Sequence, residues 1–354
     1  MEFKEDWEEA KKRFEAWWAG EVIDRVCLQV TAPREGAIRK EIPPPPLLES
    51  RWTDVEYVLA CAEERFRTTY FGGEAFPCFW PNLGPDLFAA YLGCPIKFAE
   101  GTTWAMPIIN DWETAPPLKF DRANRWWRLT LEFTEAAVQA SQGRYFVGLT
   151  DLHGGMDAIA ALRGQQALCL DVVDHPQHVE KAMAFLTPLW FEVYEPMYDV
   201  ARRAIPGSST WIGIRSPGRM YPVSCDFAAL VSPAAFNRFI LPDIEAQVEW
   251  LDHSIFHLDG PTSLPHLETL LHLPRLNGIQ WVPGAASPSM LPWMPVLKNI
   301  QAHGKNLHLP LVGAHEVEPL LSELSPKGLI LSTSCPSESA AKSLLRAAAS
   351  HTPS

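Results

Sequence analysis

The chain has 354 residues, 47% of them hydrophobic, which is enough to bury a large core. Its formal net charge of -12 argues against the basic surface that nucleic-acid binding requires. No segment has the roughly 18 consecutive apolar residues of a membrane span, and the charged first residues contain no secretory signal, so we expect a soluble, cytoplasmic protein.

The first third of the chain mixes regular and irregular patterns. Apolar residues recur at helical spacing over residues 3–18 and 54–70, and residues 26–31 alternate as a strand between these helices. Residues 72–118 are rich in proline, glycine and aromatic residues. We expect this segment to be an irregular insertion of loops rather than one helix.

The remainder of the chain alternates between strand and helix patterns. Short apolar or β-branched runs fall at residues 76–80, 145–150, 210–214, 222–225, 255–258, 278–281, 307–312 and 328–332. Helical patterns fall at residues 122–140, 176–203, 233–251, 264–271, 291–303, 316–324 and 338–348. This alternation predicts an α/β protein built as a single (β/α)8 TIM barrel over residues 1–354. In this interpretation residues 1–70 form an N-terminal extension, residues 72–118 cover the barrel mouth and residues 119–350 form the main barrel.

One predicted strand carries chemistry at its carboxyl end. His257 and Asp259 are two residues apart, so both side chains leave the strand on one face, just before Gly260 and Pro261 turn the chain. Active sites of parallel barrels lie at this end of the strands. We therefore expect the site here, although a histidine held by a carboxylate without metal is a simpler interpretation of the pair.

Further polar and aromatic side chains follow other predicted strands. Asp226 is a candidate ligand or general base, and two arginines can bind a carboxylate or phosphate bidentately. The predicted substrate-binding residues are Trp80, Asn82, His153, Arg215, Arg219, Tyr221, Gln280 and Trp281. Each of them also has a purely structural explanation, such as packing for tryptophan or solvation for arginine.

Several sequence stretches, taken in order, resemble the uroporphyrinogen decarboxylase superfamily. They are HGGMDAIAALRG at residues 153–164, LDVVDHP at 170–176, DFAALVSP at 226–233, FNRFILP at 236–242, FHLDG at 256–260, GIQ at 278–280 and STSC at 332–335. The resemblance covers roughly residues 140–350 and implies a (β/α)8 barrel. The first strand is not followed by the arginine-rich pattern of the true decarboxylases, so the chain is more similar to the corrinoid-dependent methyltransferases of this superfamily.

That branch binds zinc through a histidine and a cysteine at one strand end and a cysteine at the last strand. The matching positions here are His257, Asp259 and Cys335. The resemblance therefore implies a zinc site with a carboxylate in place of one thiolate. Zinc accepts all three ligand types and ionises a bound thiol, which makes the thiol a methyl acceptor.

Three functions follow as alternatives. The first is a zinc methyltransferase that acts on a small-molecule substrate, with the corrinoid supplied by a partner protein. The second is a metal-free decarboxylase-like lyase, in which Asp226 or Asp259 stabilises a protonated intermediate and Arg215 or Arg219 binds a carboxylate. The third is a non-catalytic barrel that binds a corrinoid, a tetrapyrrole or a partner protein. The resemblance also suggests a homodimer, and no motif for nucleotides or for serine hydrolysis is present.

Overall fold

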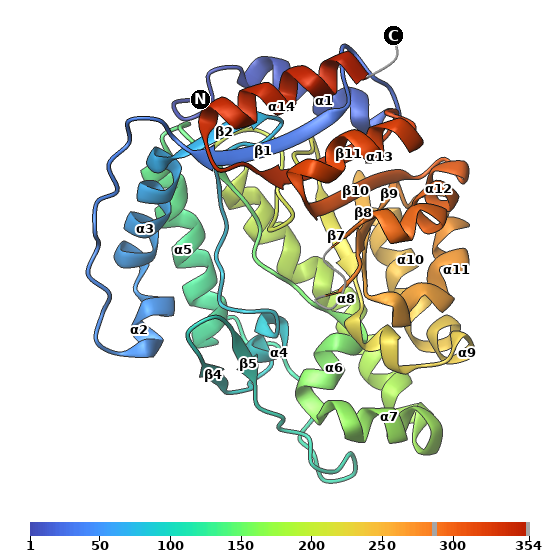
Figure 1. Cartoon of the computed structure of the whole chain (residues 1–354). Coiled ribbons are helices and arrows are strands. Elements are labelled where there is room, and N and C mark those ends of the chain that lie inside the picture. Colours follow the sequence, from blue (N-terminus) through green and yellow to red (C-terminus); the bar gives the residue numbers. More distant parts are fainter. Residues whose placement is uncertain (285–288, 352–354) are drawn as a thin grey trace.

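The computed structural model describes residues 1–284 and 289–351 and has a mixed α/β fold (Figure 1). The strands are β1 (Cys27–Pro33), β2 (Thr69–Gly73), β3 (Cys78–Phe79), β4 (Ile96–Phe98), β5 (Thr103–Ala105), β6 (Phe146–Val147), β7 (Met220–Ser224), β8 (His253–Asp259), β9 (Gly278–Val282), β10 (Asn306–Val312) and β11 (Leu329–Ser334).

The α-helices are α1 (Trp7–Trp18), α2 (Leu48–Thr53), α3 (Val55–Thr68), α4 (Leu87–Tyr91), α5 (Arg125–Ser141), α6 (Gly155–Arg163), α7 (Gln165–Asp174), α8 (Pro176–Ala201), α9 (Pro233–Ala235), α10 (Leu241–Trp250), α11 (Leu267–Leu271), α12 (Met294–Ala302), α13 (Val317–Glu323) and α14 (Glu338–His351). Short 3-10 helices are η1 (Asp226–Leu230), η3 (Pro261–His266), η4 (Leu291–Trp293) and η5 (Ala314–Glu316), and η2 (Phe236–Ile240) is a π-helix.

Seven strands form the central sheet in the order β2-β1-β11-β10-β9-β8-β7. All neighbours are parallel except β2, which runs antiparallel to β1. We expected β1 to belong to an N-terminal extension, but it pairs with β11 in register, with Cys27 opposite Ile330. The first strand of the chain is therefore part of the sheet that the last strand completes.

The predicted strand at residues 210–214 is wrong. These residues form a turn between Ser208 and Ser216, which make an isolated antiparallel bridge, and Gly213 has a φ of 68° that breaks an extended run. The strands β3 and β6 form a separate parallel pair. Among the described residues, the ladders do not close the strands into a ring, so the closed eight-stranded barrel stays a prediction.

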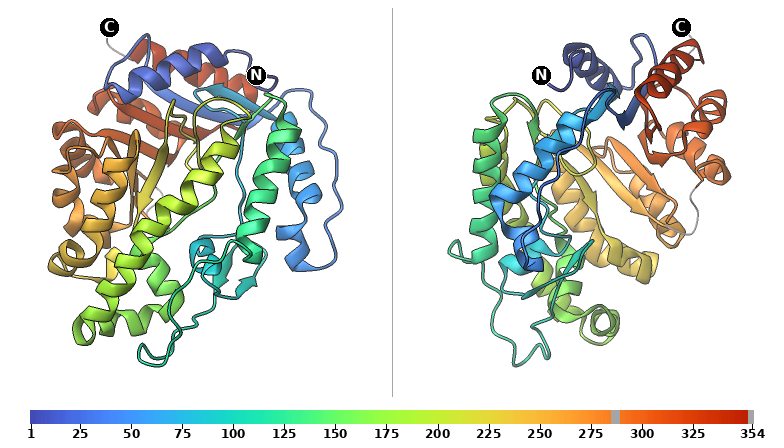
Figure 2. Two further views of the ribbon diagram at one scale, coloured as in Figure 1. Left: turned by 180° about the vertical axis from the view of Figure 1, so that it is seen from behind. Right: turned by 60° about the vertical axis from the view of Figure 1, so that its left-hand side comes forward.

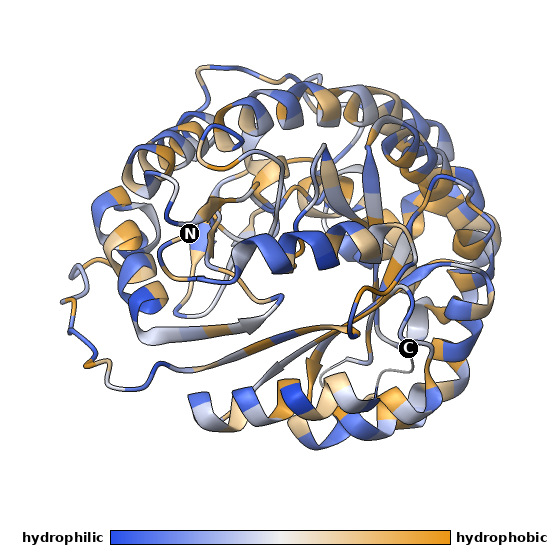
Figure 3. Cartoon of the chain, turned by 90° about the horizontal axis from the view of Figure 1, so that it is seen from above, coloured by the Kyte–Doolittle hydropathy of each residue, from blue (hydrophilic) through white to orange (hydrophobic). Residues whose placement is uncertain are grey.

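Helices lie around the outside of the strands when the molecule is seen from above (Figure 3). The long helices α5 and α8 run side by side on one flank (Figure 2). Helix α8 continues through Pro188 and Pro196 without a break. The expected insertion at residues 72–118 is more regular than predicted, since it contains β3, helix α4 and the β4–β5 hairpin.

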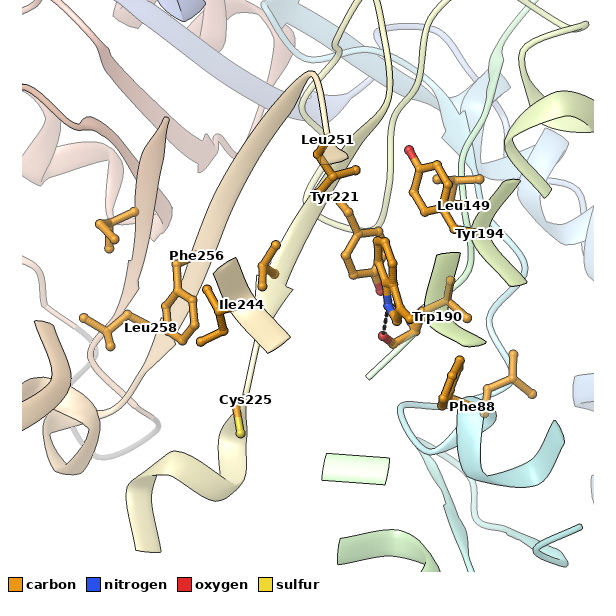
Figure 4. Packing of buried hydrophobic residues seen from close by; sticks show 14 of the residues in the cluster. Phe88, Leu149, Trp190, Tyr194, Tyr221, Cys225, Ile244, Leu251, Phe256 and Leu258 are labelled. Atoms are coloured by element: carbon orange, nitrogen blue, oxygen red, sulfur yellow. Dashed lines mark hydrogen bonds between the residues drawn. The ribbon is translucent and has the colours of Figure 1, made fainter. Parts of the chain in front are cut away.

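A large apolar core lies between the sheet and these helices. The rings of Trp190, Tyr194 and Tyr221 pack against one another with centroids 5.2–6.3 Å apart (Figure 4). All three side chains are buried. Burial of large aromatic side chains such as these stabilises a core strongly. No helix of the described residues is long and apolar enough to cross a membrane.

Helix α1 covers the amino ends of the strands. The Asn306 side chain at the start of β10 donates to the Trp17 carbonyl, and Cys27 at the start of β1 contacts the Arg13 carbonyl. The apolar face of α1 packs there against inward-facing side chains such as Ile255 and Ile330. Because this end is closed, the carboxyl ends of the strands are where a ligand can enter.

Candidate active site

His257, Asp226 and Asp259 converge at the carboxyl ends of β7 and β8. One possible ligand atom from each side chain lies within 4.8 Å of the others. The register explains the convergence: Ser224 pairs with His257, so Asp226, two residues later, comes level with Asp259. The two carboxylates are exposed and the histidine is half-buried. The group can therefore bind a cation from solvent.

The side chains on the inward face of the sheet change from apolar near the amino ends of the strands to polar near their carboxyl ends. Ile255 and Ile330 belong to the apolar layer above α1. Two residues further along the same strands, on the same face, lie His257 and Ser332. These polar side chains belong to a hydrogen-bonded row that crosses the sheet from β8 to β1.

Gln29, at the β1 end of this row, fixes which group donates and which accepts in each of its hydrogen bonds. The Gln29 amide nitrogen lies 2.6 Å from the Gly213 carbonyl and 3.4 Å from the Glu74 carbonyl, and carbonyls only accept hydrogen bonds. The Gln29 carbonyl oxygen therefore faces Ser332, whose hydroxyl donates to it over 2.6 Å. The Ser332 oxygen remains free to accept one hydrogen bond.

The Ser332 oxygen accepts that bond from His308, whose Nε2 lies 3.1 Å away. Burial lowers the pKa of His308 to about 3, so His308 is neutral and carries one N–H. Its Nδ1 must then accept from the Gln280 amide nitrogen, 2.9 Å away. The Gln280 oxygen in turn accepts from His257 Nδ1. Each step follows from donor and acceptor chemistry.

The row thus places a proton on His257 Nδ1 and leaves Nε2 as the nitrogen with a free lone pair. Metal-binding histidines are commonly oriented in this way, by a hydrogen bond from the nitrogen that does not bind the metal. The donor set of one imidazole and two carboxylates suits a divalent metal ion such as zinc. The residues present therefore fit a metal site.

A second cluster adjoins Asp226. His153 Nε2 lies 3.2 Å from Asp151, and the Asp157 carboxylate accepts from the backbone N–H groups of Asp226 and Phe227 over 2.9 and 2.8 Å. Burial lowers the pKa of His153, but the surrounding carboxylates, Asp151 first, outweigh it and raise the pKa to about 9. His153 is consequently a cation at neutral pH.

Burial raises the pKa of Asp157 to about 6, which makes this carboxyl able to exchange a proton near neutral pH. His153, Asp157 and Asp226 line a cavity of about 360 Å³ between α6 and η1. A titratable pair beside a cavity is typical of functional sites. His153 and Asp226 were predicted from the sequence, whereas Asp157 was not. Its position four residues after His153 was an available signal.

Cys335 does not belong to the group around His257. In the described part of the chain, the third member of that group is Asp226. Cys335 is buried and lines a different, larger cavity of about 810 Å³, together with Trp80 and Asn82. Among the described residues, the predicted trio of His257, Asp259 and Cys335 is thus not one of the groups whose ligand atoms lie within 4.8 Å of one another.

Two predicted substrate-binding arginines lie at the opposite end of the strands. Arg219 immediately precedes β7 and forms two hydrogen bonds of 2.9 and 2.7 Å with Glu195. Arg215 is buried and pairs with Glu15 of α1 over 2.9 Å. Both guanidinium groups are paired at the closed end, away from the carboxyl ends of the strands where the site was predicted.

Three other predictions need correction. Tyr221 is buried in β7, where its hydroxyl accepts from the Leu152 N–H and lies 3.3 Å from Asp151. Trp281 is buried and packs on Trp293, on the opposite face from Gln280. The Gln280 amide bonds to histidines at both ends and is not free for a substrate. Tyr221 and Gln280 act as supports for the site, and Trp281 is part of the outer core.

Comparisons with known proteins show the fold. No protein-family model matches the chain, and no curated protein sequence matches it. Among solved structures, the chain is similar to a methyltransferase from Methanosarcina mazei, with a TM-score of 0.59 and 16% sequence identity. The similarity covers 96% of this chain and 98% of that chain. At this identity it shows a shared fold, and the resemblance to the uroporphyrinogen decarboxylase superfamily stays a prediction.

Proposed function

We propose that the chain is a metal-dependent enzyme of methyltransferase type, with the metal ion held by His257, Asp226 and Asp259. The observation that carries the proposal is their convergence, together with the free Nε2 of His257. The full-length similarity in fold to a methyltransferase supports the reaction class. Under this proposal the strands form a (β/α)8-type barrel in which β1, β3, β6, β7, β8, β9, β10 and β11 are the barrel strands.

The metal ion, zinc in this proposal, would lower the pKa of a bound thiol or hydroxyl group and so supply an anionic methyl acceptor. The protein's own residues would hold the metal ion and fix the orientation of its ligands. His257 is held in one orientation by Gln280. In the metal-free site burial raises the pKa of Asp259, a rise that the charge of His257 opposes and that of Asp226 adds to, whereas a bound cation would hold this carboxylate ionised as a ligand.

The methyl donor is proposed to be a corrinoid carried by a separate protein. The acceptor would be a small molecule that enters at the carboxyl ends of the strands. The lyase alternative is weakened, because Arg215 and Arg219, the residues expected to bind its carboxylate, pair with Glu15 and Glu195 at the closed end.

The proposal is tested by the metal content of the purified protein. Mass spectrometry of digested samples should give about one metal ion per chain in the wild type. His257→Ala and Asp226→Asn should each lose most of it, whereas Cys335→Ser, outside the group, should retain it. If Asp226→Asn retained the metal ion and Cys335→Ser lost it, that result would contradict this ligand set and favour the trio predicted from sequence.

A second measurement addresses the reaction. The protein is incubated with methylcobalamin and a small thiol such as 2-mercaptoethanol, and the methylcobalamin absorbance is followed. Demethylation that is lost in His257→Ala supports methyl transfer. Binding of methylcobalamin without turnover, with the metal present, would contradict it and favour the non-catalytic alternative.

A further inference from the structure

Arginine side chains in this acidic protein are mostly paired with carboxylates. The sequence has nineteen arginines, and fourteen of them form ion pairs in the described structure. Three of the other five, Arg34, Arg39 and Arg65, line the same cavity of about 810 Å³. Such a concentration of unpaired cations in one concave place needs a physical explanation.

The cavity itself provides no anion. Its lining contains no aspartate or glutamate among the described residues. Arg34 donates to the carbonyls of Thr69 and Phe3 over 3.2 Å each. Among the described residues, Arg39 and Arg65 have no hydrogen-bond or ion-pair partner, although the Arg65 guanidinium lies over the Phe66 ring, 5.4 Å from its centroid. Three like charges around one space repel one another, and an anion placed among them would relieve that repulsion.

The rest of the lining suits an organic molecule. Val58, Phe79 and Trp80 provide apolar and aromatic surface. The Asn82 carbonyl oxygen accepts from the Gly84 N–H over 3.1 Å, which leaves the Asn82 amide nitrogen as a donor. A volume of about 810 Å³ lies within the range of small-molecule sites. The cavity therefore combines apolar walls with cationic side chains.

We propose that this cavity is a binding site for a small organic anion, whose carboxylate, sulfonate or phosphate group pairs with Arg39 and Arg65 while its apolar part contacts Trp80. The cavity opens at the carboxyl ends of β1 and β11, through Thr31 and Ser334. These are the same ends of the strands at which the acidic group around His257 lies. The open end thus has a cationic part near β1 and an acidic part near β8.

This charge separation narrows the class of ligand. A purely cationic compound would be repelled from the β1 side, and a compound with anions at both ends would be repelled from the β8 side. The site suits a molecule with one anionic end. The inference rests on the arginines and the cavity alone, so it does not depend on the proposed metal or on methyl transfer.

The test is isothermal titration calorimetry with matched aromatic probes at constant ionic strength. Benzoate, benzenesulfonate and phenyl phosphate carry the three anionic groups, while benzamide and benzylammonium keep the ring without the negative charge. We expect at least one anion to bind at least about tenfold more tightly than benzamide, because a charge-assisted hydrogen bond contributes strongly to affinity. The preferred anion identifies the head group.

Variants complete the test. Arg39→Gln and Arg65→Gln should each weaken binding of that anion by about tenfold. Arg128→Gln is the matched control, because Arg128 on α5 is exposed and without an ion pair but lies outside the cavity. Arg128→Gln and His257→Ala should bind the anion as the wild type does.

Because Arg39 and Arg65 are exposed, the ligand-free melting temperatures of their variants should match the wild type. Equal affinity for all three anions and benzamide would overturn the proposal. So would unchanged anion binding in both Arg39→Gln and Arg65→Gln. Loss of metal without loss of anion binding in His257→Ala would leave this inference intact while testing the metal site separately.

Discussion

His308 offers a quantitative test of the polar row inside the sheet. Its side chain is buried in β10, and burial lowers its pKa to about 3, against about 6.5 in an unfolded chain. Below pH 6.5 the unfolded chain takes up a proton at this histidine and the folded chain does not. Acid must therefore reduce the free energy of unfolding through His308, from about pH 6.5 down to about pH 3.

The size of the effect follows from this pKa difference. Each pH unit within the window changes the free energy of unfolding by about 1.4 kcal/mol. Between about pH 7.5 and pH 5 the loss due to His308 should be about 2 kcal/mol. In His308→Gln the titrating group is gone, while an amide can still accept from Gln280 and donate to Ser332.

Urea unfolding followed by circular dichroism at several pH values measures the difference. The wild type should lose about 2 kcal/mol more than His308→Gln over this range, and other titrating groups cancel because both proteins share them. Equal pH dependence of the two proteins would refute the reasoning. It would mean that His308 is protonated in the folded state and that the hydrogen-bond directions assigned to the row are wrong.

Three further predictions concern stability, each measured by urea unfolding. Glu74 is fully buried and forms two hydrogen bonds of 2.7 Å with Arg25, so Glu74→Gln should cost about 3–5 kcal/mol, and a loss below about 1 kcal/mol would contradict this. Ser332→Ala should cost about 1–3 kcal/mol, because the His308 N–H loses its acceptor, and no loss would argue against the row. Arg219→Gln should reduce the free energy of unfolding by at most about 1 kcal/mol and leave the binding of metal and anions unchanged. Weaker binding of either ligand would show that Arg219 takes part in the site.

Much of the fold could be predicted from local sequence patterns. Apolar residues at helical spacing predicted α5, α8 and α14 within a few residues of their observed bounds. The alternation of strands and helices predicted a mainly parallel sheet. Local patterns failed at residues 210–214, where Gly213 turns an apolar run that reads as a strand. They also could not show that β1 pairs with β11, since pairing is a long-range property.

In the candidate site, too, local sequence predicted some features while long-range packing decided others. The sequence alone placed His257 and Asp259 on one face at a strand end, because side chains two residues apart share a face. The same rule shows that Gln280 and Trp281 cannot both face the site.

Only the tertiary structure decided which other residues join the pair. The strand order places β7 beside β8, which brings Asp226 to His257, whereas β11 lies three strands away. Cys335, which follows β11, instead lines the cavity beside β1. The direction of hydrogen bonding from Gln29 to His257 likewise depends on neighbours across the sheet. A sequence specifies which side chains share a strand face, but strand order determines which faces meet.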